Sequence, residues 1–330
     1  MENLSIGTRI AELRKGANLA QNELAEKLMI SNKAVSKWES NNGSPSLEML
    51  IKLSEVLNCS LDYLILGKSC DDIKLINEIP IIFGKDVSGT NYTKDLCKLV
   101  HCFIGGEVGA GKSILLHNII TQLISGYKQE DLQLALIDTK RVEFYKYGNV
   151  PHLYMPVANT VDETYELLLS LEELLEKRYD VLMRSECTKI QEYNQKNPSS
   201  KIPFIVVIID ELAELIINVK RNTEILIQRL TQLGRAAGIH VIAATHRIKE
   251  CAIKESLYQN FQTRIAFKLK EPVEYCLTLK SPNNYEIRNV GEMLMFPQYA
   301  LEPIKLKVFN LSMENIDNIL RGKGISPCNL

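Results

Sequence analysis

The sequence predicts two folds in one chain of 330 residues, a small all-α domain followed by an α/β domain with a mainly parallel sheet. Three observations support this prediction. Short amphipathic helices separated by turn signals fill residues 6–66. From Ile81 onward, apolar strands alternate with long helices. Between one such strand and the next helix stands "GGEVGAGKS", a glycine-rich pattern typical of phosphate-binding loops.

Each helix of the first domain has its own boundary signals. The predicted helices are "IGTRIAELRKG", "QNELAEKLM", "SNKAVSKWESN", "SPSLEMLIKLSEVLN" and a short fifth, "SLDYLILG". Ser31 is expected to cap the third helix, in which Val35 and Trp38 are predicted to be buried. Because the tight "MIS" turn joins the second helix to the third, these two helices have helix-turn-helix geometry.

Residues 6–66 resemble the Cro/CI-type (XRE) helix-turn-helix family. The resemblance rests on Leu13, Arg14, Leu19, Gln21, Leu24, Ala25, Ser31, Val35, Ser36, Trp38, Glu39, Pro45 and Ser46. It implies that the third helix enters the major groove of double-stranded DNA, with contacts from Gln21, Asn32, Lys33, Ser36 and Lys37. The alternative is that the two lysines form a solvated helical face. Ala20 stands where this family usually has a capping Ser or Thr, which weakens the cap of the second helix.

Composition predicts the domain boundaries and the cellular compartment of the protein. We predict a helix-turn-helix domain at 1–68, a linker at 69–80 and the α/β domain at 81–330. The first 68 residues hold eight acids and eight bases, so DNA contact has to come from local basic patches.

The eight cysteines are scattered and are expected to be reduced. The longest apolar run, "FIVVII", is too short to span a bilayer and no signal-peptide core is visible, so we expect a cytoplasmic protein without membrane insertion.

The glycine-rich stretch predicts an ATP site. It satisfies the pattern G-x-x-x-x-G-K-[ST], in which backbone N–H groups and a helix N-terminus hold the phosphates. Lys112 would neutralise phosphate charge and Ser113 would ligate Mg²⁺. The alternative is a merely glycine-rich turn, which the strand–loop–helix setting disfavours. The expected nucleotide-binding residues are Gly106, Glu107, Val108, Gly109, Ala110, Gly111, Lys112, Ser113 and Ile114.

A second motif supplies the acids that ATP hydrolysis needs. The apolar run in "PFIVVIIDEL" predicts a buried strand that ends at Asp210 and Glu211. Asp210 is placed to hold Mg²⁺ through water, and Glu211 to orient and deprotonate the attacking water. Together the two motifs predict an ATPase.

Residues 81–315 resemble the motor domain of the FtsK/SpoIIIE family of DNA translocases. The resemblance rests on "DLCKLVHCFIGGEVGAGKS", "LALIDTKRVEFYKYGNVPHLYMPV", "RNTEILIQRLTQLGRAAGIHVIAATHR" and "QTRIAF". It implies a RecA-like fold, a hexameric ring around duplex DNA and ATP-driven movement along it. It also implies that an arginine from the adjacent protomer, Arg235 or Arg264, completes each site.

Several positions depart from that family. Glu107 adds a negative charge beside the phosphates where a small residue or Thr is usual. His246 stands where a glutamine usually senses the γ-phosphate, and Tyr275 replaces an arginine. These departures bear on the turnover rate more than on nucleotide binding.

Three functions are compatible with these features. The leading hypothesis is a DNA translocase loaded at a DNA site by its helix-turn-helix domain, with transfer or segregation of a mobile element as the process served. The alternative is a sequence-specific DNA-binding regulator whose weak ATPase acts as an oligomerisation switch. The third possible function is a ring that moves protein. The predicted DNA-binding helix-turn-helix domain argues against this function.

Overall fold

The computed structural model describes residues 5–17, 19–57, 59, 78–218, 222–248, 254–281, 283, 285–298 and 300–328. The chain divides into two compact units, Met1–Leu75 and Ile76–Leu330. The division falls within the predicted linker, most of which lies outside the described residues. We describe each unit by itself.

The first unit is all-α, as predicted. Its helices are α1 (Ile6–Gly16), α2 (Gln21–Leu28), α3 (Asn32–Glu39) and α4 (Leu47–Val56). Their inward faces form one core of Ile10, Leu24, Ala25, Leu28, Val35, Leu53 and Leu57. Trp38, which was predicted to be buried in the core, packs against this core and is partly buried. The predicted fifth helix lies outside the described residues.

Hydrogen bonds at the helix ends explain where the helices begin. Ser31 caps α3 as predicted, since its Oγ accepts the Ala34 N–H at 3.3 Å. Ala20, at the N-cap of α2, has no side-chain acceptor. Glu23 Oε2 compensates in part, because it accepts the Ala20 N–H at 2.7 Å.

The second unit contains a nine-stranded sheet in the order β2-β1-β9-β8-β7-β3-β6-β5-β4. The five strands from β7 to β4 pair in parallel, whereas β8, β9, β1 and β2 extend the sheet by antiparallel pairs. The bounds of the strands are β1 (Pro80–Lys85), β2 (Asn91–Asp95), β3 (Cys102–Gly105), β4 (Leu132–Ile137), β5 (Phe204–Ile209), β6 (Ile239–Thr245), β7 (Thr263–Ala266), β8 (Glu292–Phe296) and β9 (Ile304–Lys307).

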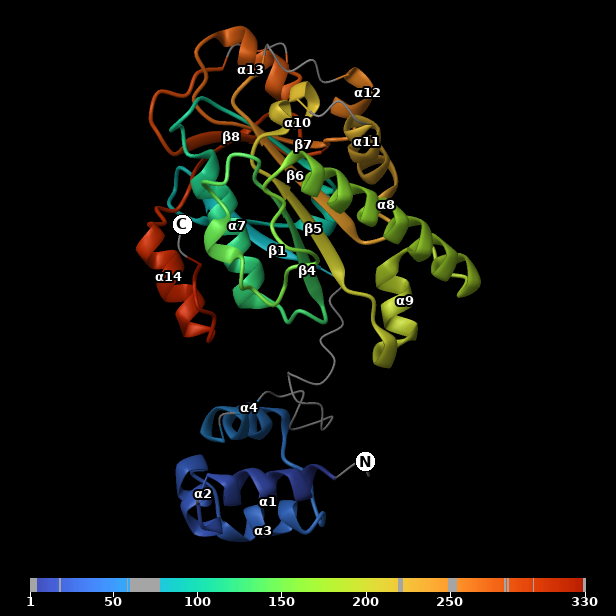
Figure 1. The fold of residues 1–330 in the computed structure, drawn as a ribbon. Coiled ribbons are helices and arrows are strands. Elements are labelled where there is room, and N and C mark those ends of the chain that lie inside the picture. Colours follow the sequence, from blue (N-terminus) through green and yellow to red (C-terminus); the bar gives the residue numbers. More distant parts are fainter. Residues whose placement is uncertain are drawn as a thin grey trace. The chain divides into compact units, whose positions relative to one another are not determined.

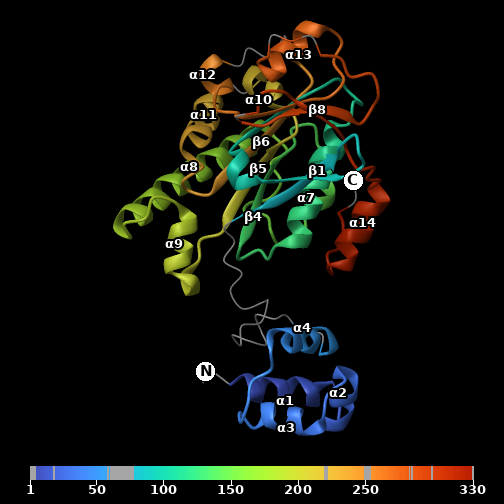
Figure 2. The ribbon, with the colours of Figure 1, turned by 180° about the vertical axis from the view of Figure 1, so that it is seen from behind.

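Helices cover both faces of this sheet (Figures 1 and 2). One core lies under α7 and α14, and the other under α8, α11 and α12. The helices are α6 (Leu96–Leu99), α7 (Lys112–Gly126), α8 (Val161–Arg184), α9 (Ile190–Lys196), α10 (Leu212–Asn218), α11 (Thr223–Leu233), α12 (Glu255–Tyr258), α13 (Pro272–Leu279) and α14 (Met313–Gly322), with 3-10 turns at Tyr145–Tyr147 and Pro198–Ser200.

The apolar composition of the central strands follows from this arrangement. In β5, Phe204, Val206 and Ile208 pack into the first core, while the residues between them pack into the second. A strand covered on both faces has no solvated side, so it is apolar throughout. In the described parts of the chain, no helix is long and apolar enough to cross a bilayer.

Two buried histidines face one another where β3 and β6 begin. His101 and His240 are both fully buried, and their ring centroids are 6.4 Å apart. His101 Nδ1 accepts the Val241 N–H at 3.0 Å, whereas His240 Nδ1 donates to the Val100 carbonyl at 3.1 Å. Burial lowers the pKa of His101 to about 3 and that of His240 to about 4. Both side chains are therefore neutral in the folded protein at ordinary pH.

These histidines should make the second unit less stable in mild acid. The unfolded chain takes up protons as the pH falls below about 6.5, whereas the folded unit resists protonation down to about pH 4, so stability falls across that window. The expected loss between pH 7.5 and pH 5 is about 2 kcal/mol for each histidine. His101→Asn and His240→Asn keep a polar atom at the Nδ1 position and should flatten the dependence. Urea unfolding followed by circular dichroism measures it, and equal slopes in wild type and the double variant would contradict the prediction.

Candidate functional site

The glycine-rich loop connects β3 to α7 at the carboxyl edge of the parallel strands. Gly106 lies in close contact with Phe267, because a Cβ there would lie 2.7 Å from the Phe267 Cβ. Gly111 has φ +119°, a conformation that favours glycine. The helix begins at Lys112, and the N–H groups of its first turn have no intrahelical acceptor. The loop therefore offers backbone donors and a helix N-terminus to a phosphate.

Lys112 and Ser113 are already hydrogen-bonded within this site. Lys112 Nζ donates to the carbonyls of Gly106 and Glu107 at 2.6 and 2.8 Å, so the amine is folded onto its own loop. Burial lowers the pKa of Lys112, although Glu211 and Asp210 act in the opposite direction. Ser113 Oγ donates to Glu143 Oε1 at 2.9 Å.

The two predicted acids follow β5 at the same edge of the sheet. Asp210 is half-buried, and its pKa is raised to about 7, first by burial and then by the negative charges of Glu143, Asp138 and Glu211. Mg²⁺ binds hard oxygen ligands and neutralises such clustered charge, so these residues fit the ion. Among the residues that the structure describes, no three His, Cys, Asp or Glu side chains form a ready-made metal site.

Glu211 is buried and held by the end of β6. Its carboxylate accepts hydrogen bonds from the Thr245 hydroxyl and from the backbone N–H of His246, and it contacts His246 Nδ1. Lys140 Nζ lies 3.9 Å from Glu211 Oε2. The structure thus brings Glu211 and His246 together as one hydrogen-bonded group beside the nucleotide loop.

Sequence patterns did not reveal the residues that the segment after β4 contributes. Asp138 is buried, and its Oδ2 accepts the N–H groups of Glu143 and Phe144 at 2.8 and 3.0 Å. This folds the segment so that Glu143 reaches Ser113. The sequence does contain a signal for these acids, because "DTKRVEF" directly follows an apolar run, just as "DEL" follows "FIVVII". Carboxyl ends of parallel strands share one edge, and acids that follow such strands are candidates for the same site.

In the first unit, α3 presents the predicted DNA-reading face. Asn32, Lys33, Ser36 and Lys37 are all exposed, while Val35 on the opposite side is buried. Gln21 Nε2 donates to Glu39 Oε2 at 2.7 Å, and its predicted contact with DNA stays a prediction. The structure therefore gives Gln21 a role in joining α2 to α3.

Glu39 connects three helices below that face. Arg14 Nε donates to Glu39 Oε1 at 2.6 Å, and a second guanidinium nitrogen donates to Oε2 at 2.9 Å. Burial opposes the ionisation of Glu39, but the hydrogen bonds from Arg14 and Gln21 outweigh it and lower its pKa. The bidentate pair fixes the orientation of α3 relative to α1.

The comparisons with known proteins agree with both units. A helix-turn-helix family model matches residues 10–64. The FtsK/SpoIIIE family model matches residues 75–202 and 196–250, which together make up more than half of the chain. The chain belongs to the FtsK/SpoIIIE family. Members of this family are P-loop ATPases, so the fold class and the family resemblance predicted from the sequence are confirmed.

Curated relatives are long proteins that match over the second unit. The chain is 31% identical over 256 residues to DNA translocase FtsK of Chlamydia trachomatis, which covers 74% of this chain and 32% of the relative. It is also 31% identical over 254 residues to DNA translocase FtsK of Listeria monocytogenes, covering 74% of this chain and 33% of the relative. The chain thus spans about a third of the length of these relatives.

Solved structures share the fold. The pCW3 conjugation coupling protein TcpA, solved as a monomer with ATPγS, superposes with a TM-score of 0.65 at 26% identity, over 75% of this chain and 71% of TcpA. The cytoplasmic domain of the Type VII secretion ATPase EccC of Thermomonospora curvata gives a TM-score of 0.66 at 20% identity, over 79% of this chain and 33% of EccC. At this identity, the EccC match shows the fold alone.

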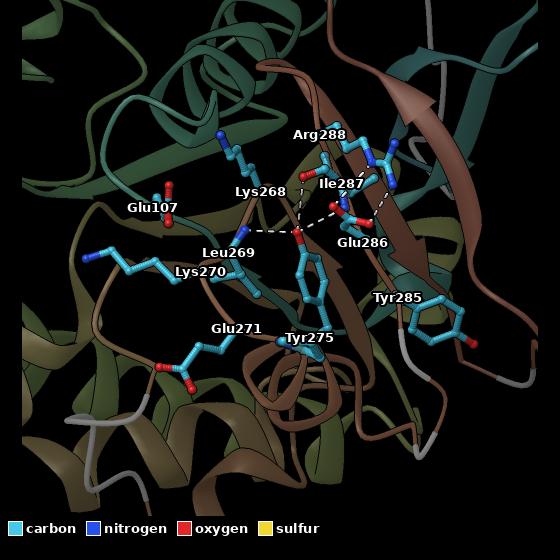
Figure 3. Close-up of a pocket in the computed structure, with 11 residues that line it drawn as sticks. Glu107, Lys268, Leu269, Lys270, Glu271, Tyr275, Tyr285, Glu286, Ile287 and Arg288 are labelled. Carbon is cyan, nitrogen blue, oxygen red and sulfur yellow. Dashed lines mark hydrogen bonds and ion pairs between the residues drawn. The ribbon is translucent and has the colours of Figure 1, made fainter.

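Tyr275 acts as an internal brace. Its hydroxyl accepts the N–H groups of Leu269 and Ile287 at 2.9 and 3.0 Å, and its side chain is fully buried (Figure 3). The brace ties the segment after β7 to residues 285–288, and these two segments line a cavity of about 510 Å³ beside the loop.

Glu107, the charged departure within the loop, lines the same cavity. Lys268, Lys270 and Arg288 line it as well, together with the acids Glu271 and Glu286, and Arg288 is paired with Glu286 at 3.2 Å (Figure 3). The Glu107 N–H donates to the Lys268 carbonyl at 2.9 Å, which anchors the loop to the end of β7.

The two candidate arginines differ in environment. Arg235 is exposed in the turn between α11 and β6. Arg235 precedes the start of β6, whereas the nucleotide loop follows the end of β3. Because β6 runs parallel to β3 and its seven residues span about 23 Å, Arg235 and the loop lie at opposite ends of these strands. Arg264 lies within β7, is partly buried, and has its guanidinium 5.1 Å from the Tyr258 ring centroid. Burial lowers the pKa of Arg264. Arg264 is therefore packed within its own unit, whereas Arg235 faces solvent.

Proposed function

We propose that this protein is an ATP- and Mg²⁺-dependent double-stranded DNA translocase, loaded at a DNA site by its helix-turn-helix unit. The main support is that Lys112, Ser113, Asp210 and Glu211 lie together at the carboxyl ends of the parallel strands. The chain also belongs to the FtsK/SpoIIIE family. This group supplies phosphate neutralisation, metal ligation and a carboxylate to activate water. Mg²⁺, when bound, neutralises charge on the β- and γ-phosphates.

Each residue at the site has a defined part in this proposal. Lys112 leaves the loop carbonyls to bind the phosphates, since a charged amine prefers an anionic oxygen to a neutral one. Ser113 and Asp210 hold the metal side of the site. Glu211 positions and deprotonates the attacking water, and His246, replacing the family glutamine, contacts Glu211 and donates a hydrogen bond near the γ-phosphate.

The partners belong to the same proposal. The protein assembles into a hexameric ring through which duplex DNA passes, and an arginine of one protomer completes the site of the next. A role in moving a mobile element is supported by the similarity to a conjugation coupling protein.

The ATPase rate with and without duplex DNA tests this proposal against the regulator hypothesis. A translocase needs fast hydrolysis that DNA stimulates, whereas an oligomerisation switch needs only slow turnover. The close contact between His246 and Glu211 favours the oligomerisation switch, because the carboxylate that would activate water already contacts His246. A rate that DNA does not change would favour the switch and contradict the translocase.

The exposed face of α3 should set the DNA site. In the full chain, Lys33→Ala with Lys37→Ala should weaken DNA binding and reduce the slope of log affinity against log salt concentration by about one for each phosphate that is no longer bound. Asn32→Ala or Ser36→Ala should relax the consensus, at about 1–3 kcal/mol for each base contact. Selection from a random duplex library, followed by affinity at several salt concentrations, measures both effects.

Lys52→Ala is the matched control for that experiment, because Lys52 is exposed on α4 and carries the same charge. It should leave the consensus unchanged. If the wild-type protein returned no consensus at all, the helix-turn-helix unit would have no loading role.

A further inference from the structure

Glu143 lies within the nucleotide site, although neither motif contains it. One carboxylate oxygen, Oε1, accepts the Ser113 hydroxyl at 2.9 Å. The other, Oε2, lies 3.3 Å from His117 Nε2. Because Ser113 is the expected Mg²⁺ ligand, Glu143 contacts the part of the site where the metal is expected.

The surrounding structure holds Glu143 firmly. Asp138 accepts the backbone N–H of Glu143, and Phe144, the next residue, is fully buried. Behind the carboxylate, His117 is buried in α7, and its Nδ1 is 2.9 Å from the Tyr147 hydroxyl. A side chain fixed on its backbone and on its far oxygen can impose an orientation on the group that it contacts.

The orientation of the Ser113 hydroxyl matters for metal binding. A hydroxyl has one proton and two lone pairs, and only a lone pair can ligate a cation. Since Ser113 donates its proton to Glu143, its lone pairs are turned away from Glu143 and are free for a metal. Carboxylates that contact a metal ligand in this way orient the ligand and raise its affinity for the ion.

We propose that Glu143 is a positioning residue for Mg²⁺, which fixes the proton of the Ser113 hydroxyl so that its oxygen faces the ion. The inference rests on the proposed nucleotide site. Glu143 contributes negative charge next to the ion and keeps Ser113 in place before nucleotide arrives. Asp138 supports this arrangement through the backbone N–H of Glu143, and His117 lies beside the carboxylate.

The test measures Mg²⁺ dependence of nucleotide binding and does not require turnover. A fluorescent, non-hydrolysable ATP analogue is titrated onto the full chain in EDTA and at increasing Mg²⁺, and the Mg²⁺ concentration that gives half of the affinity gain is recorded. Glu143→Ala should raise this concentration by about 10–100-fold. Glu143→Gln retains an acceptor for Ser113 but removes the charge, so an intermediate shift is expected. Affinity in EDTA should be unchanged or higher in both variants, because a negative charge near the phosphates has gone.

Controls separate this role from a general loss of structure. Glu173→Ala removes an exposed carboxylate from α8 and should leave the Mg²⁺ midpoint unchanged. A merely structural role for Glu143 would weaken binding equally in EDTA and in Mg²⁺, and Glu143→Gln, which preserves shape, would then behave like the wild type. Either result, or an unchanged midpoint in Glu143→Ala, overturns the inference while leaving the nucleotide site intact. If the wild-type protein bound the analogue without any Mg²⁺ dependence, the proposed site itself would fail, and the inference with it.

Discussion

Glu211→Gln should yield a protein that binds ATP normally and hydrolyses it about 10²–10⁴-fold more slowly. The substitution keeps the shape of a buried side chain and an oxygen that can accept from Thr245. It removes the charge needed to take a proton from water. Lys112→Ala should instead abolish tight binding of ATP with Mg²⁺, because it removes the only positive charge within the loop.

The two variants together separate binding from chemistry. Nucleotide affinity by equilibrium titration and turnover by phosphate release give the two quantities, and a decrease in turnover at unchanged affinity marks a residue that acts only in the reaction. Normal turnover in the Glu211→Gln protein would show that another group activates the water. Tight Mg²⁺·ATP binding by Lys112→Ala would remove the loop from the nucleotide site.

Mixing two inactive proteins should restore hydrolysis if neighbouring protomers share each site. Arg235→Ala should lower turnover by about 10³–10⁵-fold, the range seen when an arginine that stabilises the γ-phosphate is removed. The strand length that separates Arg235 from its own loop means that it can serve only a neighbouring site. Arg235→Ala protomers still carry an intact loop, and Lys112→Ala protomers still carry Arg235. A hybrid interface therefore contains one complete site.

DNA-stimulated ATPase activity of the mixture, compared with each variant alone, measures this complementation. Arg264→Ala is a useful comparison, because Arg264 is packed against Tyr258 within its own unit and its removal should affect stability more than turnover. Full activity of both single arginine variants, or a protein that stays monomeric with ATP and DNA, would rule out a shared-site ring.

Local patterns were sufficient for the parts of the site that follow single strands. The strand–loop–helix order around Lys112 and the apolar run before Asp210 both appear in the structure as predicted, because a strand buried on both faces has to be apolar and the loop conformation requires glycine. The parallel part of the sheet follows from the alternation of strands and helices.

Long-range pairings were not predictable in the same way. The antiparallel extension depends on pairs such as Lys85 with Lys307, and no periodicity in the sequence marks which distant strands will pair. The hydrogen bond of Gln21 with Glu39 and the partial exposure of Trp38 likewise depend on how α3 packs. Glu143 was missed although the acids after β4 follow an apolar run, because its contact with Ser113 depends on a turn that Asp138 stabilises.

Displacement of a third strand from duplex DNA tests translocation most directly, because only a protein that travels along the duplex can strip a bound oligonucleotide ahead of it. We expect displacement by the wild-type protein with ATP and Mg²⁺, faster when the duplex carries the site selected by the helix-turn-helix unit. We expect no displacement with a non-hydrolysable analogue or by Glu211→Gln. ATP hydrolysis that duplex DNA stimulates, without any displacement, would contradict translocation.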